Sequence, residues 1–251
     1  TEGTIYIDAS ASISTSGGDI WLGGGLDDGG ADAKITTSRG KWSSQIAGDG
    51  LPDGYAVGYN NTDYWRVGIY AAVNVSMKSG GGDIFLAGAG GPTAADGGAH
   101  IAFRAGVTAD SGAGRIGMWG RALAGTTGWN QGVCLNWDDN SNPNMITSDA
   151  ATSDAINIYS DSSASASPSA RGIVAYWYGV LDSKRGYQGL QILATKAGGG
   201  ISLTGIGGMT SNAGDGHGIW LEFADILAIS GPITLNGASS SDTATYGLES
   251  G

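Results

Sequence analysis

Few residues in this chain are suited to acid–base catalysis. It has two histidines, His100 and His217, and each precedes a short apolar segment. We interpret both as corner residues rather than as a catalytic pair. The chain has neither the Gly-x-Ser-x-Gly pattern of a nucleophile elbow nor a histidine cluster with metal-ligand spacing. We therefore expect no enzymatic activity.

A pair of adjacent carboxylates provides the alternative to that expectation. Asp138 and Asp139 lie in the sequence "NWDDN", residues 136–140. Polysaccharide-cleaving enzymes place carboxylates together in a groove. Adjacent residues on a strand point to opposite faces, however, and the sequence identifies no partner for either group. A polysaccharide lyase or glycoside hydrolase therefore stays open as an alternative.

Two acidic turn segments could supply oxygen ligands to calcium. The segments "LDDGGAD" and "GDGLPDG" contain Asp27, Asp28, Asp32 and Asp53. Their spacing fits neither an EF-hand loop nor the calcium-binding nonapeptide repeat. We interpret these side chains as solvated turn residues and expect no cofactor, with calcium as the weaker alternative.

Aromatic residues are the more unusual feature. Five of them are the middle residue of an apolar-x-apolar segment, where the side chain points away from the core, and two directly follow such a segment. In chain order the seven are Tyr6, Trp21, Tyr70, Phe85, Trp119, Tyr176 and Trp220. Three interpretations compete: long loops cover the rings as a secondary core, the rings contact another copy of the protein, or they stack on sugar rings.

The apolar-x-apolar segments recur along the chain in two related patterns. The first follows small residues, as in "SGGDIWLGGG" and "SGGGDIFLAG", and occurs at 5–7, 20–22, 84–86, 116–118, 156–158, 201–203 and 233–235. The second usually follows a single glycine and occurs at 69–71, 101–103, 133–135, 173–175, 190–192 and 219–221. From residue 68 onward, successive segments are spaced by about 16 residues.

This repetition predicts an all-β chain folded as a right-handed parallel β-helix, or β-solenoid. Each segment is too short to be stable alone, but its apolar residues can stack on those of the next coil. Glycine at the segment ends would permit the positive φ of sharp corners. With one segment per coil, about twelve coils would form a rod of about 60 Å. An antiparallel sandwich is the alternative.

The repeats favour a single domain over residues 1–251. Three segments interrupt them and are predicted to be loop insertions, at 36–66, 136–150 and 160–170. Loops of this length are commonly functional or mobile, and we expect the first two to project from one side of the rod.

Composition limits the function classes. The net charge of −11 disfavours nucleic acid and anionic membrane surfaces as partners. The one cysteine, Cys134, cannot form an intramolecular disulfide, and we assign it no role. No apolar stretch has the length of a membrane span, and no signal peptide is visible, so we interpret the chain as a mature piece or a segment of a longer one.

The glycine-rich repeats resemble those of a known family. The segments "GGDIWLGGG", "GDGLPDGYAVGY", "SGGGDIFLAGAGG" and "GGGISLTGIGG" are similar to repeats of filamentous-haemagglutinin-like bacterial surface exoproteins. The resemblance implies a right-handed β-helical shaft in a large secreted adhesin. The amino-terminal secretion domain of that family is not recognisable, so the resemblance implies a shaft role rather than a role in secretion.

We therefore expect an extracellular or bacterial cell-surface structural protein, adhesive or filament-forming. Its expected partners are other copies of itself, end to end or laterally, or host and matrix glycans or proteins. A glycan-binding module that uses the outward aromatics is the first alternative function.

Overall fold

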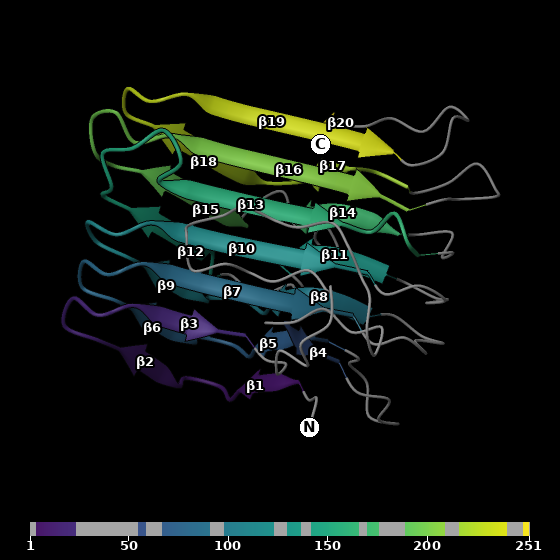
Figure 1. Ribbon diagram of the computed structural model, residues 1–251, viewed down its shortest axis with the longest axis horizontal. Coiled ribbons are helices and arrows are strands. Elements are labelled where there is room, and N and C mark those ends of the chain that lie inside the picture. The colour runs from purple at the N-terminus through teal and green to yellow at the C-terminus, as the bar shows by residue number, and fades with distance from the viewer. Residues whose placement is uncertain are drawn as a thin grey trace, which may run out of the picture.

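The computed structural model describes residues 4–23, 55–58, 67–90, 98–122, 130–136, 142–165, 170–175, 189–208, 216–239 and 248–250. These residues form strands and turns, without any helix, and the strands make three parallel sheets (Figure 1). Sheet A contains β1 (Ile5–Ile7), β5 (Ile69–Ala71), β8 (Gly98–Phe103), β11 (Asn130–Cys134), β14 (Arg171–Ala175), β17 (Ile219–Leu221) and β20 (Leu248–Ser250). Sheet B contains β2 (Ser12–Ser14), β6 (Ser76–Lys78), β9 (Thr108–Asp110), β12 (Asn144–Ser148), β15 (Leu190–Ala194) and β18 (Ala224–Ala228). Sheet C contains β3 (Ile20–Leu22), β4 (Ala56–Val57), β7 (Ile84–Ala89), β10 (Ile116–Arg121), β13 (Ile156–Asp161), β16 (Ile201–Gly207) and β19 (Ile233–Ser239).

The chain passes through the sheets in the order A, B, C and then returns to A one coil higher. Every strand pairing is parallel and joins a strand to its counterpart in the next coil. The coils wind in the right-handed sense, and the first and last described strands lie at opposite ends of the stack (Figure 1). The molecule is therefore a right-handed parallel β-helix, as the repeats predicted.

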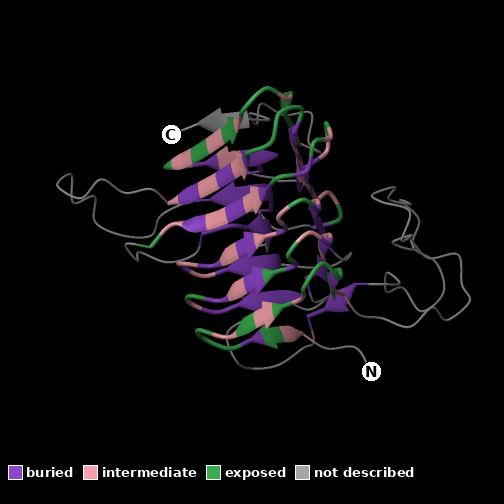
Figure 2. Cartoon of the chain, turned by 90° about the vertical axis from the view of Figure 1, so that its left-hand side faces the viewer, coloured by how far each residue is buried: buried purple, intermediate pink, exposed green. Residues whose placement is uncertain are grey.

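The core fills the inside of the coils with stacked columns of apolar side chains. In sheet C, for example, Ile84, Ile116 and Ile156 occupy one row and are all buried. Strands β13, β15 and β16 alternate strictly between buried and half-buried residues, and Figure 2 shows such alternation as purple and pink bands. Each fully buried Ile or Leu contributes about 1.5–3 kcal/mol, which compensates for the shortness of the strands.

The predicted number of coils was wrong. A full coil takes 32 residues in the regular part of the chain, as the partner pairs show between Ile69 and Ile101 and between Ile101 and Val133. The two sequence patterns are two faces of one coil, because most first-pattern segments form sheet C and most second-pattern segments form sheet A. The described strands make six coils and a final strand, about 30 Å of stack rather than 60 Å.

Two segments belong to other sheets than their patterns indicated. Residues 5–7 have the first pattern but form β1 of sheet A, and residues 190–192 have the second pattern but form β15 of sheet B. Sheet B itself was missed, because its early strands, such as "SIS" and "TAD", carry one inward apolar residue each and so lack the apolar-x-apolar pattern.

Glycines mark a seam where sheets C and A meet at close range. One row of the seam is Gly88, Gly120, Ser160, Gly205 and Gly237 of sheet C, and the facing row is Gly68, His100, Gly132, Gly172 and Gly218 of sheet A. A Cβ added at Gly88 would overlap the carbonyl oxygen of His100, and one at Gly205 would overlap that of Gly218. The sequence interpretation, that these glycines supply positive φ, is wrong for the seam, whose glycines are absent from the positive-φ set. Positive φ occurs instead at other corners, for example at Gly80 and Gly112.

Regular strands lie inside two of the predicted insertions. Within 36–66, β4 returns to the stack and pairs with β7, beside the end of β3. Within 136–150, residues 144–148 form β12, whose inward Ile146 is buried, so the insertion prediction is wrong for that half. The strand sequence Asn-Met-Ile-Thr-Ser contains polar residues, so it lacks the apolar-x-apolar pattern by which the other strands were predicted. In 160–170, β13 extends to Asp161, and residues 166–169 lie outside the described part.

Candidate functional site

The outward row of sheet A begins with two stacked tyrosines. Tyr6 and Tyr70 are register partners, and their rings stack with centroids 5.0 Å apart. Tyr6 is 62% exposed, whereas Tyr70 is buried and accepts a hydrogen bond from Arg104 Nη1 at 2.9 Å. The row continues through Ala102, Cys134 and Val174, which are buried as an apolar cluster outside the main core. The outer face of sheet A is thus largely a secondary core.

Trp220 follows Val174 in this row, toward the other end of the sheet. The Arg171 guanidinium carbon lies 4.0 Å from the centroid of the Trp220 ring, and His217 meets the same ring edge to face at 5.2 Å. Trp220 is half-buried. With a cation over one face, the ring is engaged in a cation–π contact and is a poor platform for stacking.

Sheet C carries a second aromatic group on its outer face. Trp21 and Phe85 are register partners, and their rings meet edge to face at 5.6 Å. Phe85 stacks on Trp119 at 5.3 Å. Gly117 follows Phe85 in the row, and a Cβ there would come within 2.6 Å of Trp119 and 2.8 Å of Phe85. The absence of a side chain at Gly117 therefore lets the two rings lie low against the sheet.

The seven predicted contact aromatics thus separate into different environments. Tyr6 and Trp21 are exposed, Phe85 and Trp220 are half-buried, and Tyr70 and Trp119 are buried. Tyr176 lies outside the described residues. For Tyr70 and Trp119 the structure favours the first interpretation, a secondary core, because neighbouring rings and apolar residues such as Tyr55 and Val57 pack against them.

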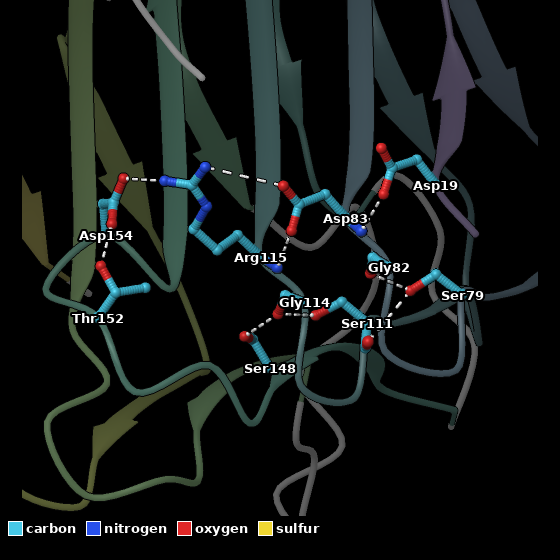
Figure 3. A network of polar contacts seen from close by, with 10 residues as sticks. All are labelled: Asp19, Ser79, Gly82, Asp83, Ser111, Gly114, Arg115, Ser148, Thr152 and Asp154. Carbon is cyan, nitrogen blue, oxygen red and sulfur yellow. Dashed lines mark hydrogen bonds and ion pairs between the residues drawn. The ribbon is translucent and has the colours of Figure 1, made fainter. Parts of the chain in front are cut away.

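A ladder of charged residues lines the corner between sheets B and C (Figure 3). The Asp83 backbone N–H donates to Asp19 Oδ1 at 2.8 Å, and the Arg115 N–H donates to Asp83 Oδ1 at 2.7 Å. Each carboxylate thereby caps the backbone of the next coil. Sequence reasoning treated the aspartates as solvated turn residues and missed this ladder, although the recurrence of a charged residue directly before Ile20, Ile84 and Ile116 was a usable signal.

Arg115 binds two aspartates at this corner. Its Nη1 donates to Asp154 Oδ2 at 2.7 Å, and its Nη2 lies 3.7 Å from Asp83 Oδ2. Burial raises the pKa of the Asp154 carboxyl, but the hydrogen bond from Thr152 and the charge of Arg115 lower it by more, so the pKa lies below its ordinary value. Asp154 is therefore a carboxylate at neutral pH, with 44% of its side chain exposed.

Buried hydroxyls join the coils directly beneath the charged ladder. Ser79 Oγ donates to the carbonyl of Gly82 in its own turn and lies 3.1 Å from the carbonyl of Ser111 in the next coil. The hydroxyls of Ser111 and Ser148 both lie 2.7 Å from the carbonyl of Gly114. The carbonyls of Gly82 and Gly114 thereby receive hydroxyl donors at the turns.

The two histidines lie in different rows. His100 replaces a seam glycine and is fully buried, with Nδ1 3.3 Å from Ser160 Oγ. His217 lies one row away, before the seam residue Gly218. Burial and the nearby charge of Arg121 lower the pKa of His100 to about 3. A buried neutral imidazole against a serine packs the seam, and it has no access to a substrate.

Metal ligands and the carboxylate pair were further candidates. Within the described residues no three His, Cys, Asp or Glu side chains gather as a metal site. Asp27, Asp28, Asp32 and Asp53, the calcium candidates, lie outside those residues, as do Asp138 and Asp139. The expectations about calcium and about catalysis stay predictions.

Comparison of the chain with protein-family models, with curated proteins and with solved structures found no match. Among the residues described, we also find no helix with the length and apolarity needed to cross a membrane. The functional argument therefore depends on the geometry of the β-helix itself.

Proposed function

We propose that this chain is a structural segment of an extracellular, adhesive β-solenoid, joined coil on coil to further solenoid. The glycine-rich repeats that resemble filamentous-haemagglutinin-like exoproteins support this proposal, as does the acidic net charge of −11. The contacts of the described side chains also support it, because the polar corner and the glycine seam both serve the stacking of coils.

The proposal depends on one observation, the exposure of core residues in the last coil. Ile233 and Leu235 of β19 point inward, in register with Ile201 and Leu203 of the coil below. Ile201 and Leu203 are 1% and 0% exposed, whereas Ile233 and Leu235 are 45% and 39% exposed. Core residues are therefore uncovered on the end face of the stack.

The opposite end has a complementary arrangement. Strands β1, β2 and β3 are the first strands of their sheets, and Ile5, Ile13 and Leu22 are only partly buried against the core. Both ends present the same three sheets in the same strand direction, so a first coil can pair with a last coil and continue every ladder. Exposed strand edges of this kind readily accept a parallel strand from another chain. We assign the end faces to a second copy of this solenoid.

The test is the self-association of the 251-residue chain. We expect sedimentation velocity to show mass rising with concentration, and electron microscopy to show rods longer than one stack. Leu235→Asp places a charge on the end face and should abolish the rise in mass. Leu227→Asp is the matched control, because Leu227 is 57% exposed on β18 but lies in the outward row with Leu193.

A chain that stays monomeric at high concentration would overturn the proposal. Equal association by the Leu235→Asp and Leu227→Asp variants would also overturn it, because the contact would then involve the sides of the stack rather than its ends.

A further inference from the structure

The last strand of sheet C contains the only Asn-Gly pair of the chain, Asn236 and Gly237 in "LNGAS". In such a pair the backbone nitrogen of the glycine readily attacks the side-chain amide of the asparagine, because glycine has no Cβ to hinder the approach. Asn236 is exposed in the outward row of β19, in register with Thr204 of the coil below. The reacting side chain is therefore open to solvent.

The backbone N–H of Gly237 points to the open edge of the same strand. In β16 below, Ile201 donates its N–H to the carbonyl of Pro232 in β19 at 2.9 Å, so its register partner Ile233 directs its own N–H away from β16. Backbone groups repeat their direction every second residue, and Gly237 lies four residues after Ile233. Since β19 is the last strand of sheet C among the residues described, no described strand accepts the Gly237 N–H.

These two features together permit a covalent step that needs only water. The Gly237 nitrogen loses its proton to solvent and attacks Cγ of Asn236; a C–N bond forms, the bond from Cγ to Nδ2 breaks, and ammonia leaves. Water then opens the cyclic imide at either carbonyl and gives aspartate or isoaspartate. The sum is amide plus water to carboxylate plus ammonium, with no change of oxidation state.

The same position one coil lower is protected by the ladder. Gly205 is the register partner of Gly237 and has the direction of Ile201, so its N–H faces β19. An N–H that is held by a neighbouring strand must first be released by a local opening of the ladder before its nitrogen can react. Strand β19 is held on one side only, so Gly237 avoids this step.

From this arrangement we propose that Asn236 is a site of spontaneous deamidation that reacts at an unjoined end of the stack and is protected once another copy is stacked on β19. Isoaspartate places the side-chain methylene in the main chain, which moves the following N–H groups out of register with an added coil. Conversion therefore removes an end from further stacking. The link to stacking rests on the proposed function, whereas the reactivity of Asn236 in the isolated chain does not.

The first experiment incubates the dilute chain at mildly alkaline pH. Peptide mapping by mass spectrometry should show a gain of about 1 Da at Asn236, and Asn236→Gln should abolish it. Thr204→Asn is the matched control, because it places the same dipeptide in the same row before the protected Gly205. In that variant Asn236 should convert about tenfold or more faster than the introduced asparagine, whose neighbour must first break a ladder hydrogen bond. Circular dichroism establishes that the variant is folded.

The second experiment repeats the mapping at high concentration. Conversion of Asn236 should slow as sedimentation velocity shows longer stacks. Leu235→Asp places a charge on the end face, so this variant should convert at the same rate at low and high concentration. Ion exchange separates converted chains by their added negative charge, and these chains should form shorter stacks than the unconverted ones.

The outcomes separate this inference from the proposed function. Absence of conversion at Asn236 in the dilute chain, or equal conversion of both asparagines in folded Thr204→Asn, would overturn the site. Conversion that continues unchanged in long stacks would overturn the protection and leave end-to-end stacking standing. A chain that never associates would overturn the proposed function and the protection, while conversion in the dilute chain would still establish the site.

Discussion

His100 replaces the glycine of the repeat and still packs within the seam. Its seam position is glycine in the coils on either side, at Gly68 and Gly132. The imidazole fits because it approaches small neighbours, with a Cβ built on Gly120 only 3.0 Å from its Nδ1. The imidazole is fully buried, and burial disfavours its charged form, so the histidine makes the seam sensitive to acid.

This environment predicts a pH-dependent stability. Burial, and next the Arg121 charge, lower the pKa of His100 from 6.5 to about 3 in the folded chain. The contribution of neutral His100 is therefore complete above about pH 6.5 and is lost as the pH falls from there toward 3. Urea unfolding should show about 2 kcal/mol less stability at pH 5 than at pH 7.5.

The control for that prediction is His100→Asn, which cannot titrate. It should be less stable overall but should lose most of the difference between pH 7.5 and pH 5. An equal pH difference in both proteins would assign the effect to other groups.

The strands are short, and contacts at the corners determine much of the alignment between successive coils. The first four coils have a hydroxyl and a charged residue at the corner between sheets B and C, and close backbone contacts join sheets C and A at the seam. The sheets are held in register by these fixed points, so that the apolar rows meet. The charged residues Asp19, Asp83 and Arg115 therefore help to align the coils as well as contributing charge to the surface.

The close approach of backbone at the seam predicts that a glycine-to-alanine substitution there lowers the stability of the fold strongly. Gly205→Ala places a Cβ on the carbonyl oxygen of Gly218 across the seam, and the next nearest atoms are also backbone, so no flexible side chain can move aside. We expect a loss of about 3 kcal/mol in the free energy of unfolding, measured by urea denaturation. Ser202→Ala, in the outward row of the same solenoid, should change it by less than about 0.5 kcal/mol.

If Gly205→Ala were as mild as Ser202→Ala, sheets C and A would have to lie further apart at this corner than the structure shows. The comparison therefore tests the seam itself rather than the general cost of a mutation.

At the scale of the whole molecule, each coil contacts mainly its neighbours. The largest sets of contacts join strands of adjacent coils, such as β16 with β19 and β10 with β13. Stability in such a stack is approximately a sum of coil and interface terms, in contrast to a domain with one central core.

Truncation tests this additivity. A chain that ends at Gly208 keeps β1 to β16 and should stay folded, with its β-sheet circular dichroism per residue nearly unchanged. Its Tm should fall by about 5–10 °C, because Ile201 and Leu203 lose the coil that covers them. Collapse of the whole signal would mean that the stack folds as one indivisible unit.

Part of this structure could be predicted and part could not. The inward pairs, such as Ile84 with Leu86 and Ile156 with Ile158, follow from the local alternation. The similar segments "SGGDIWLGGG" and "SGGGDIFLAG" place Asp19 and Asp83 64 residues apart, and these two residues lie on adjacent coils. Sheet B was missed because polar outward residues and small inward ones leave little hydrophobic signal. The ion pairs of Arg115 with Asp83 and Asp154 could not be predicted, because the three residues come from three different coils.

The all-β class and the stacking of apolar-x-apolar strands follow from the sequence alone, since a period of two is a local property of the backbone. Only the tertiary structure decided that three strands make a coil, that the seam glycines are required by close approach rather than by φ, and that Tyr70 and Trp119 are covered while Tyr6 and Trp21 are exposed. The physical reason is distance along the chain. The packed rings come from different coils, and the seam pairs, such as Gly205 with Gly218, come from two strands separated by a loop, so local alternation specifies neither.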